Sequence, residues 1–233
     1  MLDKSLTFYH FIMKMPRERL ALMPEPKLPE GYTFAMYEDG NEVDWARLES
    51  QVLEFPSQEK ALEYFNREYR DPYRNELYKR CVFIKNPEGK VVATTTAWFM
   101  DTSLGHRGWL QWISTDPAEQ GKGLGKAVII KAMQLFKDVE PNSDIYLHTQ
   151  TWSHTAIYLY HKIGFEAFPI DHVKVQWNNE RGYEIMHNGT ADALVELEKV
   201  FKPELIKSLR DGMLMPNDRE RTDWPPAEDI IQA

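Results

Sequence analysis

A glycine-rich turn between a strand and a helix is the feature that most constrains this chain. Residues 120–127, QGKGLGKA, hold three glycines within five positions. The preceding segment 108–115, GWLQWIST, carries bulky side chains on both faces, which is typical of a central strand. The following segment has apolar residues at helical spacing: Leu124, Val128, Ala132, Leu135, Phe136 and Val139. Because glycine is a poor helix former, its presence here predicts backbone N–H groups exposed to an anion at a helix N-terminus.

Two common phosphate-binding motifs do not fit this turn. The dinucleotide motif G-x-G-x-x-G requires a different spacing from that of Gly121, Gly123 and Gly125. The P-loop G-x-x-x-x-G-K-[ST] needs one more residue between its glycines, and Ala127 stands where a hydroxyl would hold Mg²⁺. The sequence therefore disfavours a nucleotide-phosphate enzyme.

The rest of the chain predicts a mixed α/β fold. A hairpin is predicted at 81–100, and Ser57 is a predicted helix N-cap. The other predicted strands are 6–15, 32–37, 144–151, 166–170 and 182–187. The other predicted helices are 41–55 ended by Pro56, 57–80 interrupted at Pro72, 153–163 closed by Gly164, 190–201 and 202–212. We expect a central mixed β-sheet flanked by helices, with a C-terminal helical extension.

Composition excludes several classes of protein. The net charge of −8 argues against a nucleic-acid partner, although a local basic patch would alter that expectation. No apolar run is long enough to span a membrane. Cys81 is the only cysteine, so an intramolecular disulfide is impossible and a cysteine-based metal site is not expected. These features predict a cytoplasmic protein without a metal.

Two motifs in order resemble those of the GNAT family of acyl-CoA-dependent N-acetyltransferases. The first is Q-x-x-G-x-G at Gln120, Gly123 and Gly125. The second is A-x-x-L-Y-x-x-x-G-F, at Ala156, Leu159, Tyr160, Gly164 and Phe165. The resemblance extends over about 30–187 and is sharpest at 109–168. It predicts a strand and arm at 1–29, a GNAT acetyltransferase domain at 30–188 and a helical extension with a tail at 189–233.

The resemblance implies acetyl-CoA as co-substrate, bound between two splayed parallel strands. The backbone of Ile113 and Thr115 would pair with the pantetheine. The pyrophosphate would lie on the loop residues Gln120, Gly121, Lys122, Gly123, Gly125 and Lys126. Ser153 stands where the family often has Asn, which implies an altered contact with the cofactor.

The resemblance also implies that Tyr160 acts as general acid toward the departing thiolate. On helical spacing alone, Tyr160 would be an ordinary core aromatic. The general base is open, since the strand before the glycines has no Glu. His148 on the next strand has a suitable intrinsic pKa, but structural packing is its alternative. Glu54 is a second candidate, and a water relay would need neither residue.

The implied reaction is acetyl transfer from acetyl-CoA to a primary amine of a small metabolite or amino-acid-like acceptor. A protein N-terminal or lysine acetyltransferase and a non-catalytic acyl-CoA sensor remain alternatives. The segment 53–65 and the late strands are expected to line the acceptor site. Its aromatic residues suggest an apolar or aromatic amine, while Glu49, Glu54 and Glu59 could hold a cation. A monomer or a homodimer is expected, and the helices after 189 could cover the acceptor, mediate a dimer or simply pack.

Overall fold

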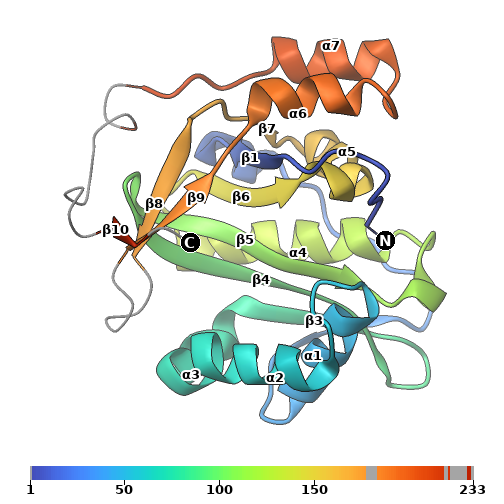
Figure 1. Ribbon diagram of the computed structural model, residues 1–233. Helices are drawn as coiled ribbons and strands as arrows, with labels where there is room; N and C mark the ends of the chain where they lie inside the picture. The colour runs from blue at the N-terminus through green and yellow to red at the C-terminus, as the bar shows by residue number, and fades with distance from the viewer. Residues whose placement is uncertain (1, 177–182, 218–219, 221–229, 232–233) are drawn as a thin grey trace. The chain divides into compact units, whose positions relative to one another are not determined.

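The computed structural model describes residues 2–176, 183–217, 220 and 230–231. The chain forms two compact units, which are described separately. Unit 1 comprises 20–98 and 110–141, and unit 2 comprises 2–19, 99–109 and the residues from 142 onward. The boundaries fall inside β4 (Val91–Thr102) and β5 (Gly105–Thr115), the two longest strands, so each strand contributes to both units (Figure 1). The mixture of strands and helices confirms the predicted mixed α/β class.

Unit 1 combines antiparallel strands with α-helices. β2 (Thr33–Met36) pairs with β3 (Cys81–Lys85), and β3 pairs with β4. The turn of the β3–β4 hairpin closes between Asn86 and Lys90, as predicted. The helices are α1 (Asn41–Gln51), α2 (Gln58–Phe65), α3 (Asp71–Arg80) and α4 (Leu124–Val139). Helix α4 packs against β3, and its predicted apolar positions Leu124, Val128, Ala132 and Phe136 are buried.

Two helix predictions in unit 1 need correction. Helix α1 ends at Gln51, earlier than predicted, because Leu53 adopts a left-handed φ of 71° that no helix can continue through. The predicted helix 57–80 starts as expected, with the Ser57 side chain accepting a bond from the Lys60 N–H. It is then divided by a π-helical turn at Asn66–Arg70, and Pro72 stands at the start of α3.

Unit 2 contains a sheet in the order β10-β9-β8-β4-β5-β6-β1-β7. The strands beyond β4 and β5 are β1 (His10–Met15), β6 (Ile145–Gln150), β7 (Glu166–Ala167), β8 (His172–Gln176), β9 (Tyr183–His187) and β10 (Ile230–Ile231). β5 and β6 are parallel, with Trp109 opposite Tyr146, whereas β1 runs antiparallel to β6. The helices are α5 (His154–Ile163), α6 (Thr190–Leu197) and α7 (Pro203–Asp211).

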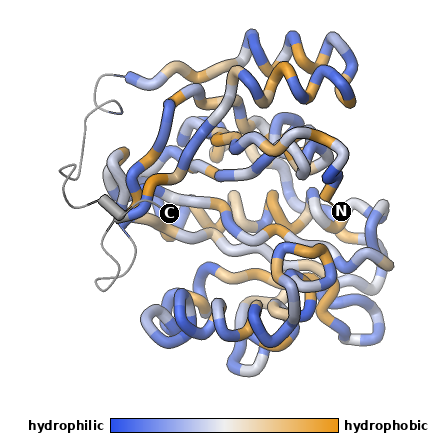
Figure 2. The backbone as a smooth tube through the Cα atoms, viewed as in Figure 1, coloured by the Kyte–Doolittle hydropathy of each residue, from blue (hydrophilic) through white to orange (hydrophobic). Residues whose placement is uncertain are grey.

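Most predicted elements of unit 2 are present, with two differences. Only Glu166–Ala167 of the predicted strand 166–170 forms β7, and β8 was not predicted. Both predicted C-terminal helices form, and Figure 2 shows hydrophobic and hydrophilic stretches alternating along them, as amphipathic helices require. Much of the polar tail after 215 lies outside the described residues. Within the described ranges, no helix is both long enough and apolar enough to cross a membrane.

Candidate functional site

The glycine loop of unit 1 has a backbone conformation that is unfavourable for any residue with a side chain. Gly121 and Gly123 have φ values of 82° and 81°, in the left-handed region where glycine is favoured. A Cβ atom built on either would meet no atom within 4 Å, so these two glycines serve the backbone conformation and not close packing. Gly123 caps α4, and its carbonyl accepts the Ala127 N–H at 3.0 Å. The N–H groups of residues 124–126 therefore precede the helical ladder and are available to an anion.

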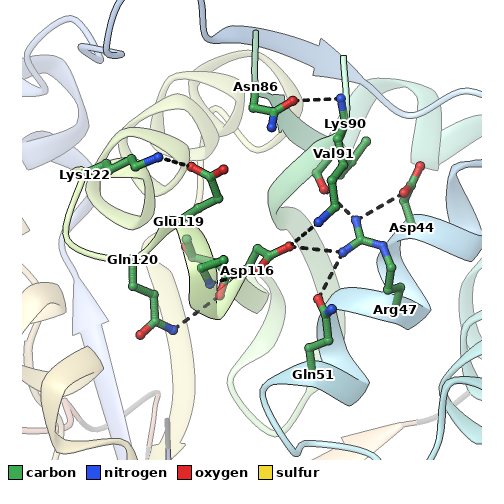
Figure 3. A network of polar contacts seen from close by, with 12 residues as sticks. Asp44, Arg47, Gln51, Asn86, Lys90, Val91, Asp116, Glu119, Gln120 and Lys122 are labelled. Carbon is green, nitrogen blue, oxygen red and sulfur yellow. Dashed lines mark hydrogen bonds and ion pairs between the residues drawn. The ribbon is translucent and has the colours of Figure 1, made fainter. Parts of the chain in front are cut away.

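Asp116 fixes the position of the segment that precedes this loop (Figure 3). Its carboxylate accepts from the Ala118 N–H at 3.0 Å, from Lys90 Nζ at 2.8 Å and from Arg47 Nη1 at 3.4 Å. Burial acts to raise the pKa of Asp116, but Lys90, the Ala118 N–H and Arg47 outweigh it and lower that pKa. Arg47 also donates to the Val91 carbonyl at 2.6 Å. The loop is thus tied to both α1 and β4.

The predicted cofactor-binding side chains of unit 1 have partners of their own. Gln120 Nε2 donates to the Thr115 carbonyl at 3.4 Å. Lys122 Nζ lies 2.6 Å from Glu119 Oε2 and 2.9 Å from the Tyr32 hydroxyl (Figure 3 draws the first contact). The hydrogen bond to Glu119 raises the pKa of Lys122, and the pairing offsets part of its charge. Lys126 is exposed on the first turn of α4.

β5 departs from regular alternation where it approaches the loop. Trp112 has a φ of 53°, an outlier for a bulky residue, directly before Ile113. Its indole Nε1 donates to the Tyr69 hydroxyl at 2.6 Å, and that hydroxyl donates to Gln111 Oε1 at 2.6 Å. The predicted alternation of side chains along 108–115 is therefore interrupted at Trp112, which changes the directions in which Ile113 and Thr115 present their backbone groups.

A buried carboxyl on α1 faces the same strand. Glu49 is 1% exposed, and burial raises its pKa to about 8, with the nearby Ser114 hydroxyl opposing the shift and the charge of Glu54 adding to it. Neither Glu49 Oε1 nor Ser114 Oγ completes a hydrogen bond with any described residue. Glu49 is therefore protonated at neutral pH. The sequence indicated Glu49 only as a possible cation holder; its position one turn after the buried Trp45 was the available signal for burial.

Unit 2 holds the second motif. Tyr160 lies on α5, is 5% exposed, and has its ring 6.2 Å from that of Phe165. Gly164 ends the helix with a φ of 116°, as predicted, and its N–H bonds to the Tyr160 carbonyl at 3.1 Å. Ser153 precedes α5, and its hydroxyl accepts from Gln150 Nε2 at 3.2 Å.

His148 of β6 belongs to a histidine cluster that the sequence did not predict. Its ring stacks on that of His10 at 4.8 Å, and His187 lies 6.5 Å from His10. Burial, followed by the charge of His10, lowers the pKa of His148 to about 4. His148 Nε2 is buried and bonds to no described residue. At neutral pH His148 is thus uncharged but accepts a proton poorly.

Comparison with known proteins shows where these motifs belong. The model of the Acetyltransferase (GNAT) family matches residues 43–165, more than half of the chain. A mycothiol acetyltransferase from Thermobispora bispora is 24% identical over 173 residues, which cover 72% of this chain and 57% of that protein. Among solved structures, a GCN5-related N-acetyltransferase from Sphaerobacter thermophilus has a TM-score of 0.54 at 20% identity, covering 73% of this chain and 50% of that one.

A second solved structure, a GNAT-family acetyltransferase from Colwellia psychrerythraea, has a TM-score of 0.50 at 14% identity, covering 69% of this chain and 54% of that one. The present chain therefore spans little more than half the length of these relatives. At such identities the structural likeness concerns the fold. The family match includes both the glycine loop and the Tyr160 helix. The chain belongs to the GNAT acetyltransferase family.

Proposed function

We propose that the protein is an N-acetyltransferase that transfers the acetyl group of acetyl-CoA to a primary amine of a small metabolite or amino-acid-like acceptor. The observation that carries this proposal is the family match over 43–165, which contains both the glycine loop and Tyr160 in the order the family requires.

The loop residues suit the pyrophosphate of CoA. The left-handed backbone and open space at Gly121 and Gly123 let the amides of 121–126 approach an anion, and the α4 dipole adds roughly half a positive charge. Gln120 and Lys126 flank these amides. Lys122 adds a positive charge to the loop, part of which is neutralised by its ion pair with Glu119. We assign the backbone of Ile113 and Thr115 to the pantetheine, and Ser153 to a further hydrogen bond with the cofactor.

In the proposed reaction, a neutral amine attacks the thioester carbonyl carbon. The new C–N bond forms, the C–S bond breaks, and the amine proton leaves to a base. Tyr160 donates a proton to the departing CoA thiolate. His148 on β6 is one candidate for this base. Because its pKa is lowered, we expect its removal to reduce turnover less than removal of the Tyr160 hydroxyl. Glu54 or a water relay are the alternatives for this step.

The similarity to a mycothiol acetyltransferase supports a small-molecule acceptor over a protein N-terminus or lysine. Retention of Tyr160 within the family motif supports catalysis over a role as acyl-CoA sensor.

A thiol-release assay with acetyl-CoA and a panel of amines, amino acids and short peptides tests this proposal. Tyr160→Phe removes only the hydroxyl, so we expect turnover to fall by about tenfold or more, equivalent to about 1.4 kcal/mol in the barrier. Tyr158→Phe, on the same helix at a side chain that is 44% exposed, is the matched control and should retain activity. His148→Asn should reduce turnover less than Tyr160→Phe.

Equal turnover of Tyr160→Phe and wild type would remove Tyr160 from the mechanism. Binding of acetyl-CoA without thiol release for any amine or peptide would favour the sensor.

A further inference from the structure

Three aromatic rings of unit 1 form a mutually contacting triangle. Phe55 follows α1, Tyr64 lies on α2 and Trp112 lies on β5. Their ring centroids are 5.2 Å apart for Phe55 and Tyr64, 5.3 Å for Phe55 and Trp112, and 5.3 Å for Tyr64 and Trp112. Each of the three side chains is partly exposed. The loop after α1, helix α2 and strand β5 thus bring three partly exposed aromatic rings together.

The triangle rests on a rigid support. Trp45 and Tyr69 are buried behind it, with Trp45 5.4 Å from Trp112 and Tyr69 6.1 Å from Tyr64. The bond from Trp112 Nε1 to the Tyr69 hydroxyl fixes the indole orientation. The rings are therefore held in place before any ligand binds, which reduces the conformational entropy lost on binding.

Backbone strain is concentrated in the segments that carry the triangle. Among the described residues, Leu53 and Trp112 are the non-glycine residues with left-handed φ, at 71° and 53°. Leu53 lies two residues before Phe55 in the same loop. Such conformations are energetically unfavourable for residues with side chains and persist where the surrounding structure imposes them.

The triangle is continuous with the strand assigned to the cofactor, and an exposed carboxylate lies in the loop that carries Phe55. Trp112 immediately precedes Ile113 in the chain, and Ile113 is the first residue assigned to the pantetheine. The loop 52–57 contains the exposed Glu54 and no basic residue.

Two basic residues near the triangle are paired with carboxylates: Lys60 with Glu63 at 2.7 Å, and Arg67 with Glu68 at 2.6 Å. The Arg67 guanidinium lies 5.6 Å from the centre of the Tyr64 ring.

We propose that the rings of Phe55, Tyr64 and Trp112 bind the aromatic group of the acceptor, so that the enzyme acts on arylalkyl amines. Ring faces favour both a stacked aromatic group and a nearby ammonium, and Glu54 attracts the cationic form of the amine before it loses its proton. This inference rests on the proposed function, because it names the substrate class of that reaction.

Matched amines test this assignment. Phenethylamine carries an aromatic ring and n-butylamine does not. The two amines are compared by thiol release from acetyl-CoA. We expect kcat/KM to be about tenfold higher for phenethylamine, a difference of about 1.4 kcal/mol. Phe55→Leu and Tyr64→Leu should each reduce the ratio of kcat/KM for phenethylamine to that for n-butylamine several-fold, mainly through the KM of phenethylamine. Tyr78→Leu is the control, since Tyr78 is an aromatic on α3 that is 38% exposed.

Equal use of the two amines by the wild type, or a preference that survives both leucine variants, would overturn the assignment. Calorimetric titration of phenethylamine and n-butylamine in the presence of CoA measures amine binding without catalysis. It therefore distinguishes failure of the ring site from failure of the proposed acetyltransferase activity. If no amine is acetylated but phenethylamine binds more tightly and Phe55→Leu removes the difference, the ring site stands and the catalytic proposal fails. If neither amine is preferred in binding, the ring site is wrong whatever the turnover.

Discussion

At the residue scale, the buried Glu49 makes the stability of unit 1 depend on pH. Its pKa is about 8 in the folded protein against an ordinary value of 4.5, so between these values the unfolded chain is ionised and the folded protein holds the proton. The free energy of unfolding should therefore fall as pH rises through this window, by up to about 4 kcal/mol. Urea unfolding at several pH values measures the slope.

Glu49→Gln keeps the size of the side chain and removes the titration, so its unfolding free energy should vary much less over the same window. Glu63→Gln, at a carboxyl on α2 that is 52% exposed, should keep the wild-type slope. A wild-type profile that is flat from about pH 5 to about pH 8 would contradict the burial of this carboxyl.

The residues that could be predicted from sequence are those whose roles are local. The cap at Ser57 and the helix end at Gly164 depend on neighbours within a few positions, and both are present. The φ of Trp112, the burial of Glu49 and the stacking of His148 on His10 depend on contacts between distant segments. Periodicity along one segment carries no information about such contacts.

At the scale of elements, the end of α1 stores strain that a substitution can release. Leu53 is 56% exposed, so its side chain contributes little burial, while its left-handed φ costs about 1–2 kcal/mol. Glycine adopts this φ freely but loses more conformational entropy on folding, about 0.5–1 kcal/mol. We therefore expect Leu53→Gly to raise the free energy of unfolding by about 0.5 kcal/mol, as measured by the denaturant midpoint.

Leu22→Gly provides the comparison, because Leu22 is 79% exposed and lies in the 3₁₀ helix Arg17–Leu22 without a left-handed φ. That variant should be neutral or destabilised. A loss of stability in Leu53→Gly as large as in Leu22→Gly would show that the loop does not store strain.

Element boundaries are predictable where strong signals coincide. Helix α4 follows from its apolar stripe and its glycine N-cap, and the β3–β4 hairpin follows from its turn residues. β8 is five residues long with buried Val173, Lys174 and Val175, and it gains its partners from β4 and β9. A strand this short is specified by its neighbours more than by its own composition, which explains why it could not be predicted from the sequence.

At the scale of the whole molecule, a buried ion pair in unit 2 joins Lys14, near the start of the chain, to Glu220, near its end. Glu220 Oε1 lies 2.5 Å from Lys14 Nζ and accepts from the Tyr146 hydroxyl at 2.7 Å, while Lys14 also pairs with Asp144 at 2.9 Å. Removing Glu220 leaves Lys14 buried with one partner. We expect Glu220→Ala to lower the free energy of unfolding by about 2–3 kcal/mol, as measured by urea unfolding.

The control for this pair is Glu198→Ala, which breaks an exposed contact with Arg210. Exposed pairs contribute about 0–1 kcal/mol, so this variant should resemble the wild type. Equal stability of Glu220→Ala and Glu198→Ala would show that the buried pair does not stabilise the fold.

The family was predictable at this scale because two motifs occur in the required order. The division into units was not, because each unit gathers separate stretches of chain and both share β4 and β5. The boundaries near 29 and 188 remain our proposal for the extent of the acetyltransferase domain and its extension.

Calorimetric binding of acetyl-CoA to the wild type, Gly123→Val and Gly89→Val tests the role of the glycine loop most directly. Both glycines have a left-handed φ, 81° and 79°, and a Cβ atom at either would meet nothing within 4 Å, so the two substitutions impose similar backbone strain. Only Gly123 belongs to the loop assigned to the pyrophosphate. We predict that the wild type and Gly89→Val bind acetyl-CoA alike, and that Gly123→Val binds about tenfold more weakly or worse. Absence of binding to the wild type, or equal binding by Gly123→Val, would contradict the assignment of this loop to the cofactor.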